Sequence, residues 1–161
     1  MKRSLSIPEW YQMAQNGTNL PVRIPLMGYS MFPLIRYNRD LVTIMPIQEP
    51  LQIGDIVLFS NHCSESYVVH RVWDISDRGI LIWGDNCVGS DGWIPMEDIL
   101  GKAVLIERGK RKIIPDPKRG IRWARFWHRA KKLYDFYDRS KVRLYQLIYG
   151  KKREVSDENR D

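Results

Sequence analysis

The chain has 161 residues, of which 43% are hydrophobic and 11% aromatic, enough apolar side chain for one domain with its own core. This composition excludes a chain that is disordered throughout. The formal net charge of +7 is unevenly placed, because residues 1–116 hold 12 Lys and Arg against 13 Asp and Glu, whereas residues 117–150 hold 10 against 2.

The first expected element is a short helix over residues 6–16. Ser6 is a capping residue with Glu9 three positions later, and Pro8 suits the first turn of a helix. Asn and Gly at 16–17 end the pattern. We assign residues 1–19 to this N-terminal helical segment.

From residue 20 onward the pattern changes to short runs rich in Val, Ile and aromatic residues, separated by Gly, Pro, Asn and Asp. The runs are LVTIM (41–45), DIVLFS (55–60), YVVHRVW (67–73), GILIWG (79–84) and KAVLIE (102–107). The segment DISDRG has the residues of a hairpin turn between the third and fourth runs. We therefore predict a mainly β domain over residues 20–114, a small coiled sheet or partly open barrel without parallel βαβ units.

Beyond PDPKRG (115–120), whose two prolines and glycine mark a boundary, the pattern becomes helical. Apolar residues then recur three or four positions apart, at Trp123, Trp127, Ala130, Tyr134, Tyr137, Leu144, Tyr145 and Ile148. We predict one long or two shorter amphipathic helices over 120–149, within a basic aromatic extension over 118–150. Residues 151–161 contain a single apolar residue and are expected to be a disordered tail.

The partner of the basic extension is left open between three interpretations. Its aromatic stripe packs on the β-domain, or the helix lies in a membrane interface and attracts anionic lipids, or it binds nucleic acid or another acidic partner. Nucleic acid is the least expected partner, because the chain has no helix-turn-helix signature. The sequence also lacks a signal-peptide core and any run of about 18 apolar residues. We expect a cytoplasmic protein without a transmembrane segment, with peripheral membrane contact through 120–149 left open.

The chain has only two cysteines, Cys63 and Cys87, and no CxxC pair. Two free thiols in a reducing compartment are therefore expected. A metal site formed by His62, Cys63 and Cys87 has no recognised ligand spacing. We expect neither a metal nor another cofactor.

Three residues of the β-domain have the types needed for a nucleophile, a base and an orienting carboxylate: Ser30, His70 and Asp91. Strand alternation places His70 on one face with Val68 and Val72, where a partly desolvated imidazole suits a general base. A serine becomes nucleophilic when such a base takes its proton, and a carboxylate on the other ring nitrogen fixes the tautomer. Each residue also has an ordinary structural role, as a local hydrogen-bonder, a satisfied strand residue or a turn former.

Five motifs in order carry a family resemblance. They are GYSMFP (28–33), IGDIVLF (53–59), VVHRV (68–72), GDNCVGSD (84–91) and IPMEDILGKAVLI (94–106). Over about residues 20–110 the chain resembles the signal peptidase I and LexA-type serine peptidase superfamily. A histidine within VVHRV is similar to the Ser-His branch, the archaeal and endoplasmic-reticulum type, rather than to the branches with a lysine base.

The resemblance implies a coiled small-barrel β-fold and a serine endopeptidase that processes a peptide or protein precursor. Ser30 is then the nucleophile, His70 the general base and Asp91 the supporting carboxylate. Asp85 of the GDN turn shapes that turn or is the alternative carboxylate. The backbone N–H of Ser30 is the family's usual donor to the oxyanion.

The resemblance also implies an extended substrate that pairs as an added strand and is cleaved after small residues. Tyr29, Met31 and Phe32 would wall the substrate site or anchor the serine turn. Met27 stands where signal peptidases have a small or hydroxyl residue, so a side-chain oxyanion donor is not expected. We expect no N-terminal anchor, because a short polar helix precedes the serine motif, and the chain is similar to small anchorless bacterial members, whose substrates the resemblance does not supply.

A noncatalytic peptide-binding module of the same fold is the competing class. The presence of all three catalytic residue types favours the enzyme, because a degenerate binder tends to lose one. A self-cleaving repressor needs a DNA-binding head, for which about twenty residues before the fold leave no room.

Overall fold

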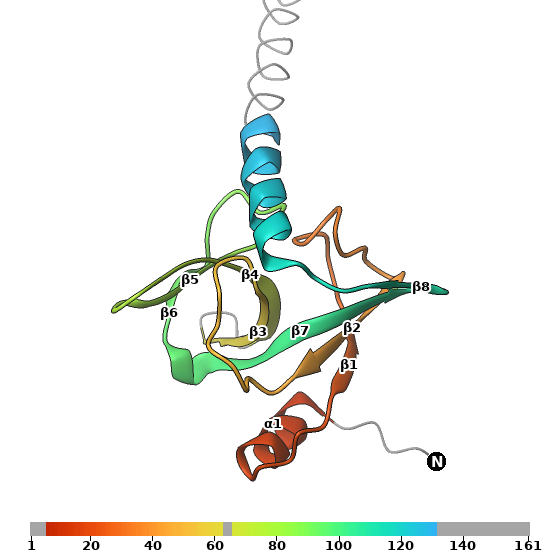
Figure 1. Ribbon diagram of the computed structural model, residues 1–161, viewed down its shortest axis with the longest axis vertical. Coiled ribbons are helices and arrows are strands. Elements are labelled where there is room, and N and C mark those ends of the chain that lie inside the picture. Colours follow the sequence, from red (N-terminus) through yellow and green to blue (C-terminus); the bar gives the residue numbers. More distant parts are fainter. Residues whose placement is uncertain (1–5, 63–65, 132–161) are drawn as a thin grey trace, which may run out of the picture. The chain divides into compact units, whose positions relative to one another are not determined.

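The computed structural model describes residues 6–62 and 66–131 and divides the chain into two units, 1–124 and 125–161. Its elements are α1 (Ile7–Gln15), β1 (Val22–Pro25), β2 (Asp40–Met45), β3 (Ile56–Asn61), β4 (Ser66–Ser76), β5 (Gly79–Trp83), β6 (Gly92–Ile94), the 3-10 turn η1 (Met96–Asp98), β7 (Ile99–Arg108) and β8 (Arg111–Ile113) (Figure 1). A further helix begins at residue 117 and is described to residue 131. The remainder of the predicted 120–149 stripe and the tail lie outside the described residues.

The strands form one antiparallel sheet, as expected for a mainly β domain. Their order is β1-β2-β7-β3-β4-β5-β6, and β8 pairs with β7 (Figure 1). The register shifts where β7 pairs with β2 and with β3, and where β4 pairs with β5, and such bulges increase strand bending and twist. The sheet consequently curls into a half-barrel instead of lying flat.

All five predicted runs are strands, and the predicted hairpin turn joins β4 to β5. The sequence analysis missed β1, β6 and β8, which have four, three and three residues. Segments this short hold too few side chains for alternation to be recognised. Pairing with a longer neighbour makes them strands.

Apolar side chains gather in two clusters on the two faces of the curled sheet. The first contains Trp10, Val22, Met31, Ile35, Val42, Ile44, Ile56, Leu58, Val69, Leu100, Ala103 and Ile106. The second contains Val57, Phe59, Val72, Ile80, Ile82 and Ile99, with Val68 packed against it. In β4, Val69 thus faces one cluster while Val68 and Val72 face the other, which confirms the predicted alternation around His70.

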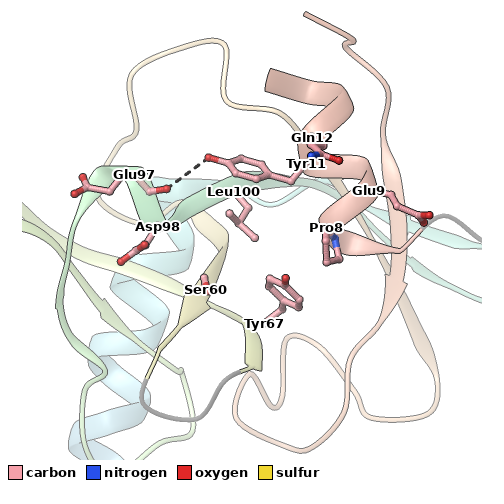
Figure 2. A pocket seen from close by; sticks show the side chains of 9 residues that line it. All are labelled: Pro8, Glu9, Tyr11, Gln12, Ser60, Tyr67, Glu97, Asp98 and Leu100. Atoms are coloured by element: carbon pink, nitrogen blue, oxygen red, sulfur yellow. Dashed lines mark hydrogen bonds between the residues drawn. The ribbon is translucent and has the colours of Figure 1, made fainter. Parts of the chain in front are cut away.

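Helix α1 is joined to the sheet by Trp10, which is only 1% exposed within the first cluster. Its indole Nε1–H donates to Leu20 O at 2.7 Å. Ser6 and Glu9 form the predicted capping box at the helix start. Figure 2 shows Tyr11 on the same helix reaching across to η1, where its hydroxyl donates to Glu97 O at 3.5 Å.

The contact of Trp10 with the core predicts a large loss of stability on truncation. Trp10→Ala should lower the free energy of unfolding by about 3–5 kcal/mol, through the cavity and the lost indole hydrogen bond. Met13→Ala is the control on the same helix, since Met13 is 39% exposed, and should change it by about 0.5 kcal/mol or less. Urea unfolding at 25 °C measures both. Equal effects would contradict the assigned packing of α1.

Candidate active site

Ser30 lies in the turn of residues 28–35, between β1 and β2. The N–H of Ile35 donates to Met31 O at 2.9 Å, which closes part of this turn. Met31 and Ile35 are both buried in the first core cluster. Two apolar side chains therefore anchor the turn that carries the serine.

The three residues expected to wall the site or anchor the turn divide between those roles. Met31 is an anchor, because its side chain is in the core. Tyr29 is 63% exposed and Phe32 38% exposed, so both rings are available to a ligand. Tyr29 also packs edge-on against Tyr37, with ring centroids 5.6 Å apart.

The serine turn is tied to the segment GDNCVGSD by two hydrogen bonds from one residue. The N–H of Asn86 donates to Ser30 O at 2.7 Å, and its side-chain Nδ2 donates to Tyr29 O at 3.1 Å. The next residue, Cys87, contacts the imidazole of His70. Asn86 thus places the serine backbone beside the residue that meets the candidate base, a link for which the sequence analysis had no signal.

The structure brings His70 and Asp91 together. His70 Nδ1 lies 2.7 Å from Asp91 Oδ2, and both side chains are largely shielded from solvent. The N–H of Asp91 donates to Ile82 O at 2.9 Å, which fixes the carboxylate beside the end of β5. A carboxylate on Nδ1 leaves the other ring nitrogen, Nε2, for proton exchange.

The neighbour of Nε2 is the thiol of Cys87, with sulfur and nitrogen 4.0 Å apart. Gly84 makes room for this contact, because a Cβ there would lie 2.6 Å from Cys87 Sγ and 2.9 Å from His70 Nε2. Among the described residues, the side-chain hydrogen bonds of His70 go to Asp91 and Cys87, and none joins it to Ser30 Oγ. Cys87 was not among the predicted site residues, although it stands within a motif quoted for them.

Asp85, the alternative carboxylate, has a different partner. Its two oxygens accept from Arg71 Nε and Nη2, each at 2.7 Å, and both side chains are buried. Arg71 Nη1 also donates to Gly54 O at 2.8 Å, and Gly120 lies against the guanidinium where any Cβ would clash with it. Asp85 therefore holds the 84–91 segment to β4, and Asp91 is the carboxylate on the imidazole.

Two opposing effects set the pKa of His70. Burial lowers it, while the hydrogen bonds and charges of Asp91 and Cys87 raise it, and the net result is a pKa raised to about 9. The imidazole is consequently protonated at neutral pH. It becomes a base when the pH rises toward that value.

A second His-Asp pair, His62 with Asp98, has similar geometry in a different setting. His62 Nε2 lies 2.8 Å from Asp98 Oδ1, but the His62 side chain is 73% exposed.

Asp98 lines a cavity of about 420 Å³ between α1 and the sheet (Figure 2). Ser60 and Tyr67 line this cavity too and are paired neighbours in β3 and β4, on the face opposite His70. The cavity is therefore separate from the His70 cluster.

The cluster of His70, Asp91 and Cys87 is not part of a metal site within the described residues, and no family model covers it. Within residues 6–62 and 66–131, no group of three or more His, Cys, Asp and Glu side chains is placed to hold a metal ion. Cys87 is a free thiol, whereas Cys63 lies outside the described residues. No protein-family model matches the chain. In the part of the chain that the structure describes, no helix has the length and apolar character needed to cross a membrane.

The different partners of the two carboxylates predict opposite results for two isosteric substitutions. Asp85→Asn should lower the free energy of unfolding by about 3–5 kcal/mol, because it leaves a buried guanidinium that cannot lose its charge. Asp91→Asn should cost less, because His70 can release its proton, and it should lower the pKa of His70 well below about 9. Urea unfolding and NMR titration of the imidazole Cε1–H measure these effects. The reverse order of stabilities, or an unchanged His70 pKa in Asp91→Asn, would contradict the assignment.

Proposed function

We propose that the protein is a serine endopeptidase of the signal-peptidase-like type, with Ser30 as nucleophile, His70 as general base and Asp91 as its carboxylate. The observation that carries the proposal is the 2.7 Å hydrogen bond between Asp91 and His70 Nδ1, which directs Nε2 away from the carboxylate. Asn86 supports it by joining the serine turn to the segment that lines Nε2. The order of the five motifs and the antiparallel curled sheet agree with a signal-peptidase or LexA-like fold.

The reaction is acyl transfer to the serine. Neutral His70 takes the hydroxyl proton through Nε2 as Ser30 attacks the peptide carbonyl, and Asp91 stabilises the imidazolium that forms. The imidazolium then protonates the leaving amine. In the second half the ring activates water against the acyl-enzyme. The hydroxyl must move into hydrogen-bond distance of Nε2 for the first step, and catalytic hydrogen bonds commonly tighten when substrate binds.

The substrate is an extended peptide that pairs with an edge of the sheet. β1 is an end strand in the sheet order and leads directly into the serine turn. A peptide added to this edge would gain backbone hydrogen bonds and run toward Ser30. The exposed rings of Tyr29 and Phe32 lie in the same turn and would contact its side chains.

The proposed mechanism predicts that peptide cleavage depends on Ser30 and His70. A proteome-derived peptide library incubated with the wild type should acquire new ends, identified by mass spectrometry. Ser30→Ala and His70→Ala should reduce cleavage by about a thousandfold or more. The rate should rise with pH through about 9, where His70 loses its proton and becomes a base.

The matched controls come from the other His-Asp pair and its neighbouring cavity. Ser60→Ala and His62→Ala change the same residue types outside the His70 cluster and should cleave like the wild type. Cleavage that persists in Ser30→Ala and His70→Ala would overturn the proposal. A wild type that binds library peptides without cutting them would favour the noncatalytic peptide-binding module instead.

We further propose that the helix from residue 117 contacts an anionic membrane surface. Trp123 is 42% exposed and Phe126 is 65% exposed, so the aromatic residues are not all buried. Arg122, Arg125 and Arg129 are exposed in the same stretch. Aromatic rings interleaved with arginines are typical of helices that lie in the headgroup region. A peripheral position would bring the peptidase close to membrane-associated precursors.

Vesicle flotation tests this contact. The full chain should float with phosphatidylcholine vesicles that contain phosphatidylglycerol and should float less in high salt. Arg122→Gln with Arg125→Gln should weaken binding roughly tenfold or more, since each cation near the surface contributes about 1 kcal/mol. Lys110→Gln with Arg111→Gln removes the same charge from the β7–β8 hairpin and serves as the control. Equal loss in the two double variants would contradict a contact specific to the helix.

A further inference from the structure

Cys87 shares the imidazole that the proposed peptidase uses. Its sulfur lies 4.0 Å from His70 Nε2, the nitrogen opposite the one bound by Asp91 at 2.7 Å. A thiol, an imidazole and a carboxylate aligned in this order have the geometry of a nucleophile, its base and the group that orients the base. Three separate segments supply them: the 84–87 turn, β4 and the loop before β6.

The position of the thiol is fixed from several sides. The N–H of Cys87 donates to Gly84 O at 3.1 Å, which closes a tight turn. Gly84 has no side chain in the space that the sulfur and the ring occupy. The preceding residue, Asn86, is bonded to the serine turn, and Asp85 is held by the buried Arg71. The contact between sulfur and imidazole thus follows from the backbone of the whole segment.

The imidazole of His70 lies next to the sulfur and carries a positive charge at neutral pH. An imidazolium beside a sulfur stabilises the thiolate, which is the nucleophilic species. Asp91 lies on the far side of the ring, and the charge of Asp85 is matched by Arg71. His70 is buried, whereas Cys87 is partly exposed.

We propose that Cys87 is a covalent modification site for small soft electrophiles, activated by His70 and Asp91. The sulfur attacks the electrophilic carbon, a sulfur–carbon bond forms, and the leaving group departs with the bond's electron pair. The thiol proton goes to solvent, because the ring already carries its own proton at neutral pH, and the imidazolium stays beside the sulfur. The adduct then occupies the space beside Nε2. It thereby denies Ser30 its base, a consequence that rests on the proposed peptidase function.

Iodoacetamide is the probe, and it reacts by losing iodide. The full-length protein is alkylated at neutral pH, and mass spectrometry follows the peptides that contain Cys87 and Cys63 separately. An ordinary thiol is only a few per cent thiolate at neutral pH, so a stabilised thiolate has a larger reactive fraction. A less basic thiolate is intrinsically less nucleophilic, which reduces the gain. In the wild type, Cys87 should therefore react about tenfold faster than in His70→Gln or Asp91→Asn. Cys63 in the same samples is the internal reference and should react equally in all three proteins.

The outcomes separate this proposal from the peptidase. Equal Cys87 rates in the wild type and in both variants, with near-UV circular dichroism showing that all are folded, would overturn it even if the wild type cleaves peptides. Fast Cys87 labelling in a protein that cleaves no peptide would uphold the reactive thiol and reject the peptidase. If both hold, alkylated wild type should lose cleavage in proportion to Cys87 labelling. Full cleavage by alkylated protein would overturn the proposed blocking of Nε2.

Discussion

The buried ion pair between Arg71 and Asp85 is the interaction on which the geometry of the site depends. Arg71 follows His70 in β4, and Asp85 lies two residues before Cys87. Their two hydrogen bonds, each 2.7 Å long, join the strand that carries the imidazole to the segment that lines it. Removing one partner would leave a buried charge without compensation, which is far more costly than never having placed it there. The imidazole therefore has one fixed set of neighbours.

The two carboxylates of the segment differ in function because their cations differ. A guanidinium is a permanent cation, so Asp85 opposite Arg71 has a constant, purely structural partner. His70 gains and loses its proton near its pKa of about 9, so Asp91 stabilises a charge that comes and goes. The changing charge of His70 suits Asp91 to a role in chemistry, and the constant charge of Arg71 suits Asp85 to holding the segment in position.

Strand locations and the face of His70 could be predicted because both are local: β-branched runs favour extended backbone, and alternation assigns the faces. The three-to-four-residue spacing of apolar residues placed Trp123 on the buried stripe of its helix. In the structure the buried positions are Ile121 and Ala124, and Trp123 is exposed, which the spacing alone could not predict. The partners of Asp85 and Asp91 were equally beyond prediction. Both lie in one eight-residue segment, and only its three-dimensional closure decides which cation each one meets.

One imidazole nitrogen, Nε2, faces the thiol of Cys87 and is the nitrogen left for the proposed serine chemistry. Asp91 occupies Nδ1, so only Nε2 can exchange a proton with Ser30 or Cys87. The protonated ring cannot accept a proton from the serine hydroxyl. Loss of that proton creates the base that the proposed serine chemistry needs. The proposed serine chemistry therefore gains its base as the pH rises through about 9.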